Sequence, residues 1–361
     1  MKSARTAPRR INEQIRHIRA SSQLGWRDVL MVTLRDVAKH AGVSSITVSR
    51  VVNDSGYVSQ ATREKVEAAV NELGYVPNKV ASNLRSSQSD MLALVLPDIT
   101  NSFWTSIARG VEDEAWERGY GVFVCNTDNN PTKEDSYIHR LLQQRVLGVI
   151  LVPTPIPESE SQLMRLQRHH LRTVVLHRRL STGVVANVVR SDGEGAARAL
   201  AQELAKAGRR RIAFVGQPFS NPASADRLRG FRDGLRDAGS EVHVELIRSG
   251  EETEETSGYH MVTQLLALPE PPDAILLANS RIAVSGLRAL RHANVAIPED
   301  ITVAAFHDIR DMDEFAPKLI TAVQPSYRMG QLATRLLLES SSNGEGPYRE
   351  IILEPTIHRW S

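Results

Sequence analysis

From Met91 onward, short apolar runs alternate with longer segments that have the periodicity of helices. The apolar runs contain few charges, as do strands buried on both faces of a sheet. They are MLALVLP, GVFVCN, LGVILVP, TVVLH, RIAFVG, DAILLA and TVAAF. Strands that alternate with helices predict an α/β fold built on doubly wound parallel sheet. Because this part of the chain is about 270 residues long, we expect it to form two such lobes.

The composition limits the environment in which the protein works. No apolar run approaches the ~20 residues that a membrane-spanning helix needs. The N-terminus has no apolar segment typical of a secretory signal. A single cysteine, Cys125, excludes an internal disulfide framework. These features predict a cytoplasmic protein without membrane partners.

The net charge of +2 is unevenly distributed. Residues 1–90 carry 14 Lys or Arg against 8 Asp or Glu, a charge of +6, and the remainder carries 30 against 34, a charge of −4. A basic N-terminal part on a slightly acidic body favours a polyanionic partner for that part alone. A solvated basic tail is the alternative for residues 1–30, which are Arg-rich without strong periodicity and which we expect to be a disordered extension.

Residues 33–74 have the pattern of three short helices. Thr33 and Ser44 are expected to cap the first two, and Ser59 or Thr62 to begin the third. One face of the second helix is not needed for packing. It carries Ser45, Ile46, Ser49 and Arg50. An arginine fork can donate to guanine, and an apolar side chain can contact a thymine methyl. A helical pair that serves only packing is the alternative.

These segments resemble the DNA-binding headpiece and hinge of the LacI/GalR family of transcriptional regulators. The resemblance is carried by TLRDVAKHAGVSSITVSRVVN, VSQATREKVEAAVNELGYVPN and KVASNLRS. It continues into the body through LALVLPDITNSFWTSIARGVEDEAWERGYGVFVCNTD, RLLQQRVLGVILVPT, RLRGFRDGLRDAG, VAIPEDITVAAF and LITAVQPSYRMGQLATRLLLE. Only residues 1–30 lie outside it.

The resemblance implies the domain organisation. Residues 31–77 would form a helix-turn-helix DNA-binding domain, 78–90 a hinge helix and linker, and 91–361 a periplasmic-binding-protein-like effector and dimerisation core. The first lobe of that core would comprise 91–188 and 324–342. The second would comprise 189–320 and 348–361, so that EIILEP returns to the second lobe.

The resemblance also implies a homodimer that binds a pseudo-palindromic double-stranded DNA operator. Leu84 falls at the position of the family's hinge leucine, which inserts into the minor groove. The residues expected to bind DNA are Thr33, Ser44, Ser45, Ile46, Thr47, Ser49, Arg50, Asn53, Asn78, Lys79, Ala81 and Leu84.

The same resemblance implies an effector pocket between the lobes. For Phe103 and Trp104, packing in the core is the alternative to a place in the pocket. Arg227 matches an arginine that many relatives use to hold a ligand hydroxyl or carboxylate. The expected pocket residues are Asn101, Phe103, Trp104, Asp128, Arg178, Asn221, Arg227, Asn279, Ser280, His307 and Asp308.

Two departures from the family pattern concern the charge of the pocket. Ser280 stands in ANS where many relatives have an aspartate, and VVLHRRL places His177, Arg178 and Arg179 where a carboxylate often follows the strand. Losing carboxylates and gaining guanidinium groups favours an anionic ligand. We therefore expect the effector to be a sugar acid or sugar phosphate rather than a neutral sugar.

Catalytic patterns are absent from the sequence. It has no G-x-S-x-G elbow, no Walker loop and no H-E-x-x-H helix, so we expect no enzyme and no cofactor. HDIRDMDE, from His307 to Glu314, suggests solvated acidic residues more than a metal site. The sequence thus predicts a ligand-responsive regulator, a repressor of a carbohydrate or sugar-acid utilisation operon. The alternatives are a sugar-binding or enzymatic protein with a vestigial head, and a global regulator that uses a protein corepressor.

Overall fold

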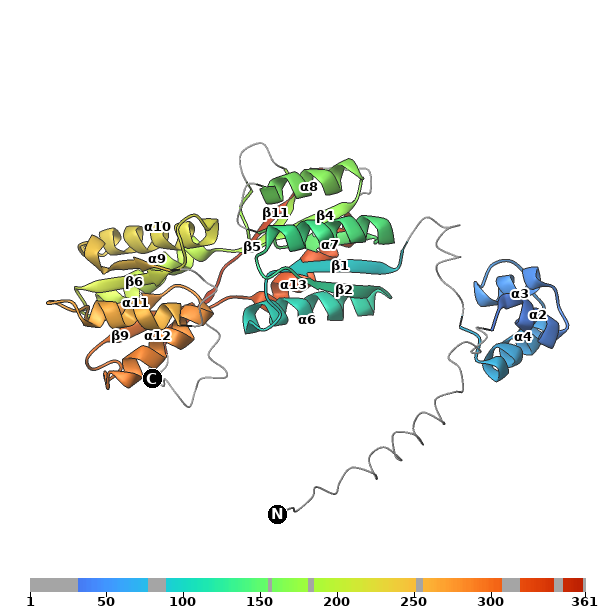
Figure 1. The fold of residues 1–361 in the computed structure, drawn as a ribbon, viewed down its shortest axis with the longest axis horizontal. Helices are drawn as coiled ribbons and strands as arrows, with labels where there is room; N and C mark the ends of the chain where they lie inside the picture. Colours follow the sequence, from blue (N-terminus) through green and yellow to red (C-terminus); the bar gives the residue numbers. More distant parts are fainter. Residues whose placement is uncertain are drawn as a thin grey trace, which may run out of the picture. The chain divides into compact units, whose positions relative to one another are not determined.

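The computed structural model describes residues 32–76, 89–154, 158–180, 185–250, 256–306, 319–340 and 347–359. It divides into two units, Met1–Ser87 and Gln88–Ser361 (Figure 1). Several sequence predictions lie outside the described residues: the extension 1–30, the hinge residues Asn78, Lys79, Ala81 and Leu84, and the pocket residues His307 and Asp308.

The headpiece consists of three helices, α2 (Leu34–Ala41), α3 (Ser45–Val52) and α4 (Gln60–Leu73). A capping box begins α2. The Thr33 amide donates to the Asp36 carboxylate at 2.9 Å, and the Asp36 amide donates to the Thr33 hydroxyl at 3.3 Å. Val37, Val48 and Val66, one from each helix, have no exposed surface and form the centre of the core. Burying one apolar stripe per helix gives this small unit its shape.

The body contains two six-stranded sheets, one in each lobe (Figure 1). The first-lobe sheet has the order β11-β5-β4-β3-β1-β2, with bounds Glu350–Leu353, Asn187–Ser191, Arg172–Leu176, Gly148–Leu151, Met91–Leu96 and Gly121–Asn126. The second-lobe sheet has the order β12-β10-β9-β8-β6-β7, with bounds Thr356–Arg359, Ile320–Val323, Thr302–Ala305, Ala274–Leu277, Ile212–Gly216 and Ile247–Ser249. Every pairing in them is parallel except that of β10 with β12. The predicted doubly wound α/β class is confirmed.

Helices cover both faces of each sheet. In the first lobe, α6 (Ser102–Glu117) and α13 (Ser326–Glu339) pack on one face, and α7 (Pro131–Gln144) and α8 (Glu158–Arg168) pack on the other. Alternate residues of β1 divide between the two cores: Leu92, Leu94 and Leu96 join the first, while Ala93 and Val95 join the second. A strand that is apolar on both sides therefore lies in the middle of the layers.

The second lobe has the same three-layer plan. On one face lie α9 (Gly193–Lys206) and α10 (Pro222–Asp237), and on the other lie α11 (Ser257–Leu266) and α12 (Ser280–His292). A one-turn 3₁₀ helix, Val244–Leu246, precedes β7. The close packing of α9 on α10 depends on Gly230, where an added Cβ would lie 2.0 Å from the Glu194 carbonyl oxygen.

Three segments cross between the lobes, after β5, after β10 and after β11. The expectation that EIILEP returns to the second lobe is wrong, because β11 pairs with β5 in the first-lobe sheet. The expected boundary at residue 188 is also displaced, since β5 runs to Ser191 within the first lobe. Ile351 and Leu353 pack against the first-lobe core, which explains the placement of β11. Of the two C-terminal strands, β12 is the one that joins the second-lobe sheet, where it pairs with β10.

The sequence did not reveal every element. Helix α8 and strands β5, β7, β10 and β12 were not among the predicted segments, and most of these are short. None of the helices in the described part of the chain is long and apolar enough to cross a membrane.

Candidate functional site

Helix α3 has a solvent-facing side whose residues take no part in the headpiece core. Its N-terminus is capped by Ser44, whose hydroxyl accepts from the Thr47 amide at 3.1 Å. Val48 and Val51 are buried below, whereas Arg50 is exposed and Ile46 is 68% exposed. An apolar side chain held at the surface beside an arginine suits a base edge in a DNA groove.

The C-terminal end of α3 orders its polar side chains. The Asn53 side-chain amide donates to the Ser49 carbonyl at 2.8 Å and to the Ser49 hydroxyl at 3.2 Å. The predicted residues Ser44 to Asn53 therefore gather on one helix, while Thr33 caps α2. Tyr57, almost fully exposed in the following turn, was not predicted, although an aromatic side chain beside a polar turn is a sequence signal for it.

Between the two lobes of the body lies a cavity of about 390 Å³. Eight of the predicted pocket residues line it, namely Asn101, Phe103, Trp104, Arg178, Asn221, Arg227, Asn279 and Ser280. The other lining residues that the structure describes are Pro97, Ser102, Ser106, Asn129, His177, Gln217, Ala223, Phe306, Ala322, Gln324 and Ser326. Most of them follow strands or begin helices, as expected at the carboxyl ends of parallel strands.

The prediction that Asp128 lines the cavity is wrong. Asp128 is exposed and accepts from the Lys133 ammonium at 2.6 Å and from the Asn126 side-chain amide at 2.5 Å. The bond from Lys133 is the main cause of the lowered pKa of the Asp128 carboxyl. Both Asp128 and Asn129 have left-handed backbone angles, and the turn that they form brings Asn129 to the cavity in place of its neighbour.

Three helix N-termini lie at the cavity, each capped by an asparagine of its wall. Asn101 accepts from the Phe103 amide at 3.0 Å, Asn221 from the Ala223 amide at 3.1 Å, and Asn279 from the Ile282 amide at 2.8 Å. The helices that they begin are α6, α10 and α12. The partial positive charge of a helix N-terminus favours a nearby anion.

Two buried arginines contribute positive charge to the same cavity. Arg178 is 6% exposed and donates to the Pro153 carbonyl at 3.2 Å and to the Asn221 side-chain oxygen at 2.6 Å. Arg227 is 5% exposed, donates to the Ala278 carbonyl at 2.6 Å, and lies 4.4 Å above the Phe306 ring. Among the lining residues described, none is Asp or Glu. The described part of the wall therefore contributes the positive charge of Arg178 and Arg227.

An aromatic cluster forms another part of the wall. The Phe103 and Trp104 ring centroids are 4.7 Å apart, and the His177 ring lies 5.0 and 5.3 Å from them. Trp104 belongs both to the first-lobe core and to the cavity, so packing and lining do not exclude each other here. Burial, with the charges of Arg227 and Arg178, holds the pKa of His177 well below its usual range. The imidazole is therefore neutral at pH 7.

The cavity wall also offers polar atoms that lack a hydrogen-bond partner within the described residues. They are His177 Nδ1, the Asn279 side-chain nitrogen and the Gln324 side-chain oxygen. His177 and Gln324 were not among the predicted pocket residues, and neither were Gln217 and Phe306. Each follows a strand, which is the signal that could have identified them.

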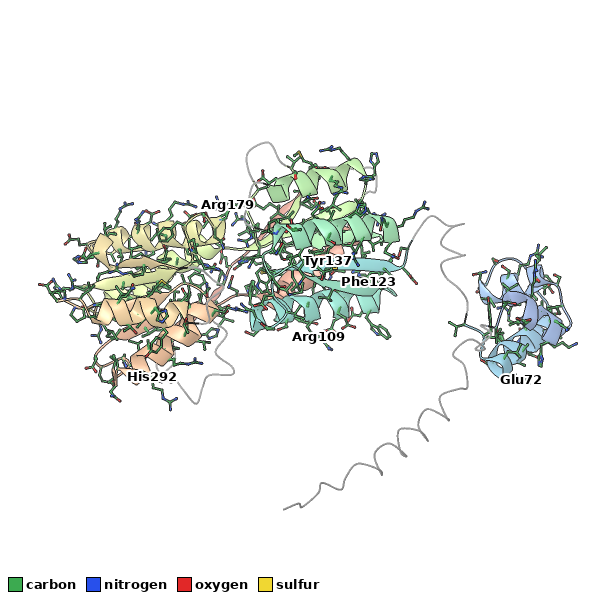
Figure 2. All side chains as sticks on the ribbon, in the orientation of Figure 1. Glu72, Arg109, Phe123, Tyr137, Arg179 and His292 are labelled. Atoms are coloured by element: carbon green, nitrogen blue, oxygen red, sulfur yellow. The ribbon has the colours of Figure 1, made fainter. Side chains whose placement is uncertain are left out.

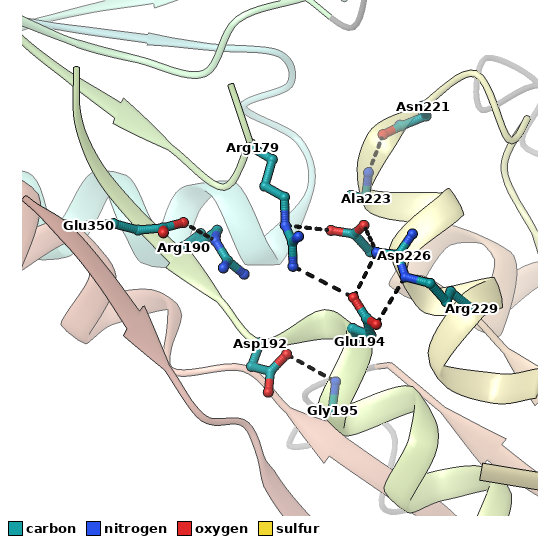
Figure 3. A network of polar contacts seen from close by, with 10 residues as sticks. All are labelled: Arg179, Arg190, Asp192, Glu194, Gly195, Asn221, Ala223, Asp226, Arg229 and Glu350. Carbon is teal, nitrogen blue, oxygen red and sulfur yellow. Dashed lines mark hydrogen bonds and ion pairs between the residues drawn. The ribbon is translucent and has the colours of Figure 1, made fainter. Parts of the chain in front are cut away.

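Arg179 does not share the environment of Arg178. Arg179 is not among the residues that line the cavity, and Figure 3 shows it between two carboxylates of the second lobe. Its guanidinium lies 3.5 Å from Glu194 and 3.4 Å from Asp226. Arg229 bonds to the same two carboxylates, at 2.7 and 2.5 Å. Of the two neighbouring arginines, only Arg178 is therefore positioned to meet a ligand in the cavity.

Comparison with known proteins gives consistent matches over both units. The family model "Bacterial regulatory proteins, lacI family" matches residues 33–78. The model "Periplasmic binding proteins and sugar binding domain of LacI family" matches residues 89–352.

Individual relatives match over nearly the whole chain. The HTH-type transcriptional regulator RegA of Clostridium saccharobutylicum is 33% identical, with 90% of this chain and 97% of that protein covered. The ribose operon repressor of Escherichia coli strain K12 is 32% identical, with 91% of this chain and 98% of that protein covered. A solved structure of the lac repressor dimer bound to operator and the anti-inducer ONPF has a TM-score of 0.80 at 28% identity. The match covers 91% of this chain and 98% of that chain.

Proposed function

Because the chain belongs to the LacI family of bacterial regulatory proteins, we propose that it is a dimeric repressor that binds a pseudo-palindromic operator and responds to an anionic sugar derivative. The observation that carries the DNA-binding part is the outward face of α3, on which Ile46 in the first turn and Arg50 in the last turn are exposed. The relatives are transcriptional regulators, which argues against an enzyme with a vestigial head.

Base reading by α3 follows from the chemistry of that face. Arg50 offers two parallel donors to guanine, and Ile46 an apolar contact for thymine, each worth ~1–3 kcal/mol of discrimination. Phosphate contacts from the lysines and arginines of the headpiece add affinity without sequence preference. An electrophoretic shift on DNA from the protein's own upstream region, with excess competitor DNA, tests this assignment. Binding that the competitor removes entirely would contradict it.

Dimer formation is supported by the edge of the first-lobe sheet. Strand β2 is the last strand in the order, and its neighbouring residues Phe123 and Val124 are 43% and 52% exposed. Phe123 is labelled in Figure 2. Trp116 of α6 is exposed as well. An apolar strand edge in a stable monomer invites pairing with another chain. A second copy of this protein is the partner that suits a palindromic operator.

Light scattering on the purified protein tests this dimer. We expect a dimer that Val124→Lys converts to a monomer, because a charge on that edge opposes apolar contact. Val284→Lys, at an exposed apolar position of the second lobe, is the matched control. A dimer of unchanged stability in Val124→Lys would place the interface elsewhere.

An anionic effector is supported by the charge of the cavity. Two buried guanidinium groups and three helix N-termini face a space whose described lining contains no carboxylate. An acid or phosphate would gain charge-assisted hydrogen bonds there. A neutral sugar would find amide and hydroxyl partners in the wall but would bring no negative charge to the two guanidinium groups. The aromatic cluster suits the apolar face of a sugar ring.

Calorimetry tests the effector class directly. Gluconate, 2-keto-3-deoxygluconate and glucose 6-phosphate are compared with glucose, galactose and ribose. We expect at least one acid or phosphate to bind more than tenfold tighter than every neutral sugar. Tight binding of a neutral sugar, with no binding of the charged compounds, would overturn the anionic assignment and leave the DNA-binding assignment standing.

A ligand between the lobes can change DNA affinity only through unequal affinity for two states of the protein. A ligand that contacts both lobes binds the closed arrangement more tightly than the open one, which supplies such a difference. Couplings of 1–3 kcal/mol are typical of allosteric proteins. The ligand is therefore expected to change operator affinity by about 5- to 150-fold.

A further inference from the structure

Outside the cavity, an arginine of one lobe bonds to a carboxylate of the other. Arg281, at the second position of α12 in the second lobe, donates to the Asp98 carboxylate, which follows β1 in the first lobe. We propose that this pair is a latch that holds the two lobes closed before any effector is bound. It is independent of the effector's identity and of DNA binding.

Asp98 is held ready for this contact by its own loop. One carboxylate oxygen accepts from the Thr100 amide at 2.9 Å and from the Thr100 hydroxyl at 2.7 Å. The other oxygen accepts from Arg281, whose guanidinium also lies 3.2 Å from the Thr100 hydroxyl. A carboxylate fixed by its neighbours loses little conformational entropy when the arginine arrives.

Arg281 gains more from this contact than an arginine elsewhere on α12 would. It lies in the first turn of the helix, where the helix dipole disfavours a cation. A carboxylate from the other lobe offsets this repulsion, so separating the lobes would leave the arginine beside a positive helix end. The helix therefore adds to the stability of the closed arrangement.

A second contact supports the latch from the cavity side. The Ser280 hydroxyl, one residue before Arg281, donates to the Asn101 side-chain oxygen at 3.3 Å. Ser280 and Asn101 line the cavity, as does Pro97 next to Asp98. The latch thus lies at the rim of the cavity, where it would have to break for the lobes to separate.

The Arg179 cluster provides a contrast within the same molecule. Arg179 also joins the lobes, and Figure 2 shows it where they meet. Its partner Glu194 lies three residues after the end of β5, beside a crossing segment. Neither Asp98 nor Arg281 adjoins a crossing segment. Groups next to a pivot move little relative to each other. The Arg281–Asp98 pair therefore reports on opening, as does the Arg178–Asn221 hydrogen bond between the lobes in the cavity wall, whereas the Arg179 cluster does not.

Distances between spin labels on the two lobes test the latch in the full-length protein. The labels are placed on Gln144→Cys and Ala238→Cys, both exposed and in different lobes, with Cys125→Ser removing the native thiol. Pulsed electron resonance is recorded without DNA or effector. We expect Arg281→Gln and Asp98→Asn each to raise the ratio of open to closed molecules about fivefold.

Three further variants make the result decisive. The double variant should open the lobes no more than either single variant does, because both changes remove one interaction. Exchanging the charges, with Asp98→Arg and Arg281→Asp together, should restore part of the closed population. Arg288→Gln, an exposed arginine further along α12, should leave the distances unchanged.

Unchanged distance distributions in both single variants would overturn the proposal. So would single effects that add in the double variant, because the two side chains would then act independently. Circular dichroism of each labelled variant separates a change of lobe arrangement from a loss of folding, and the charge exchange keeps the proposal testable if one single variant does not fold.

Discussion

The outward face of α3 and the cavity between the lobes both depend on arginine, which is exposed on the helix and buried in the cavity. On α3, Arg50 is exposed at the end of a short helix whose other face supplies the headpiece core. In the cavity, Arg178 and Arg227 are buried and already bond to carbonyl and amide oxygens. An exposed arginine suits a large partner such as DNA, whose surface excludes water from the arginine on binding. Buried arginines that are already held in place suit a small anionic ligand.

The largest effect is expected from Arg50→Ala. If both halves of an operator are read by Arg50, the dimer should lose about 10²- to 10⁴-fold in specific affinity, because each contact is worth ~1–3 kcal/mol. Weak, salt-sensitive binding through phosphates should remain. Fluorescence anisotropy measures the ratio of the affinities for specific and scrambled DNA. Lys65→Ala, which removes an exposed cation of α4, is the control. A variant that keeps the wild-type sequence preference would show that Arg50 does not read bases.

Arg227→Ala tests the cavity side. Loss of a buried charge-assisted bond should weaken an anionic effector about 10- to 100-fold, while operator affinity without effector stays within a few-fold. Arg229→Ala is the matched control, since this neighbour on the same helix pairs with Glu194 and Asp226 outside the cavity. Calorimetry and anisotropy together separate the two effects. Equal losses in both variants would show that the arginines of α10 act through folding rather than through the ligand.

The difference in locality explains how much could be predicted from sequence. Caps, turns and the apolar stripes of α2, α3 and α4 are set within a few residues, so the headpiece could be predicted in detail. The alternation of strands and helices predicted the class of the body in the same way. The cavity combines residues from several strand ends, and a displacement of one residue in a turn was enough to exchange Asp128 for Asn129.

Long-range pairing accounts for the other error. Strand β11 is short and partly exposed, and nothing within EIILEP distinguishes one sheet from the other. Its place depends on β5, more than 150 residues earlier, and on the Arg190–Glu350 ion pair at 2.5 Å. The resemblance to the family supplied the two-lobed plan but not the residues at which the chain crosses from one lobe to the other.

The low pKa of His177 makes a pH-dependent prediction of moderate size. Below pH ~6.5 the unfolded chain takes up a proton at this position and the folded protein does not, so the folded state loses stability as the pH falls. The loss is at most about 1.4 kcal/mol per pH unit. Chemical denaturation from pH 8 to pH 5 should therefore show a steeper decline in wild type than in His177→Gln. Parallel curves would mean that the imidazole is solvated.

The smallest effect is expected from deleting residues 1–30. They carry a basic excess, and none of the residues assigned to base reading or to the cavity lies among them, so operator affinity at physiological salt should change less than tenfold. Titrations at several salt concentrations measure it, and the salt slope is the sensitive quantity. A loss beyond tenfold, with a shallower slope, would make the extension a third, purely electrostatic contact with DNA.

Protection of the protein's own upstream DNA from nuclease cleavage, with gluconate or glucose 6-phosphate added in parallel, tests both operator reading by α3 and its control by an anionic ligand. We expect one protected site with two-fold symmetry at nanomolar protein, and we expect Arg50→Ala to lose it. One of the charged compounds should shift the protein concentration needed for protection by at least fivefold. Protection without symmetry that persists in Arg50→Ala and ignores every ligand would contradict both assignments.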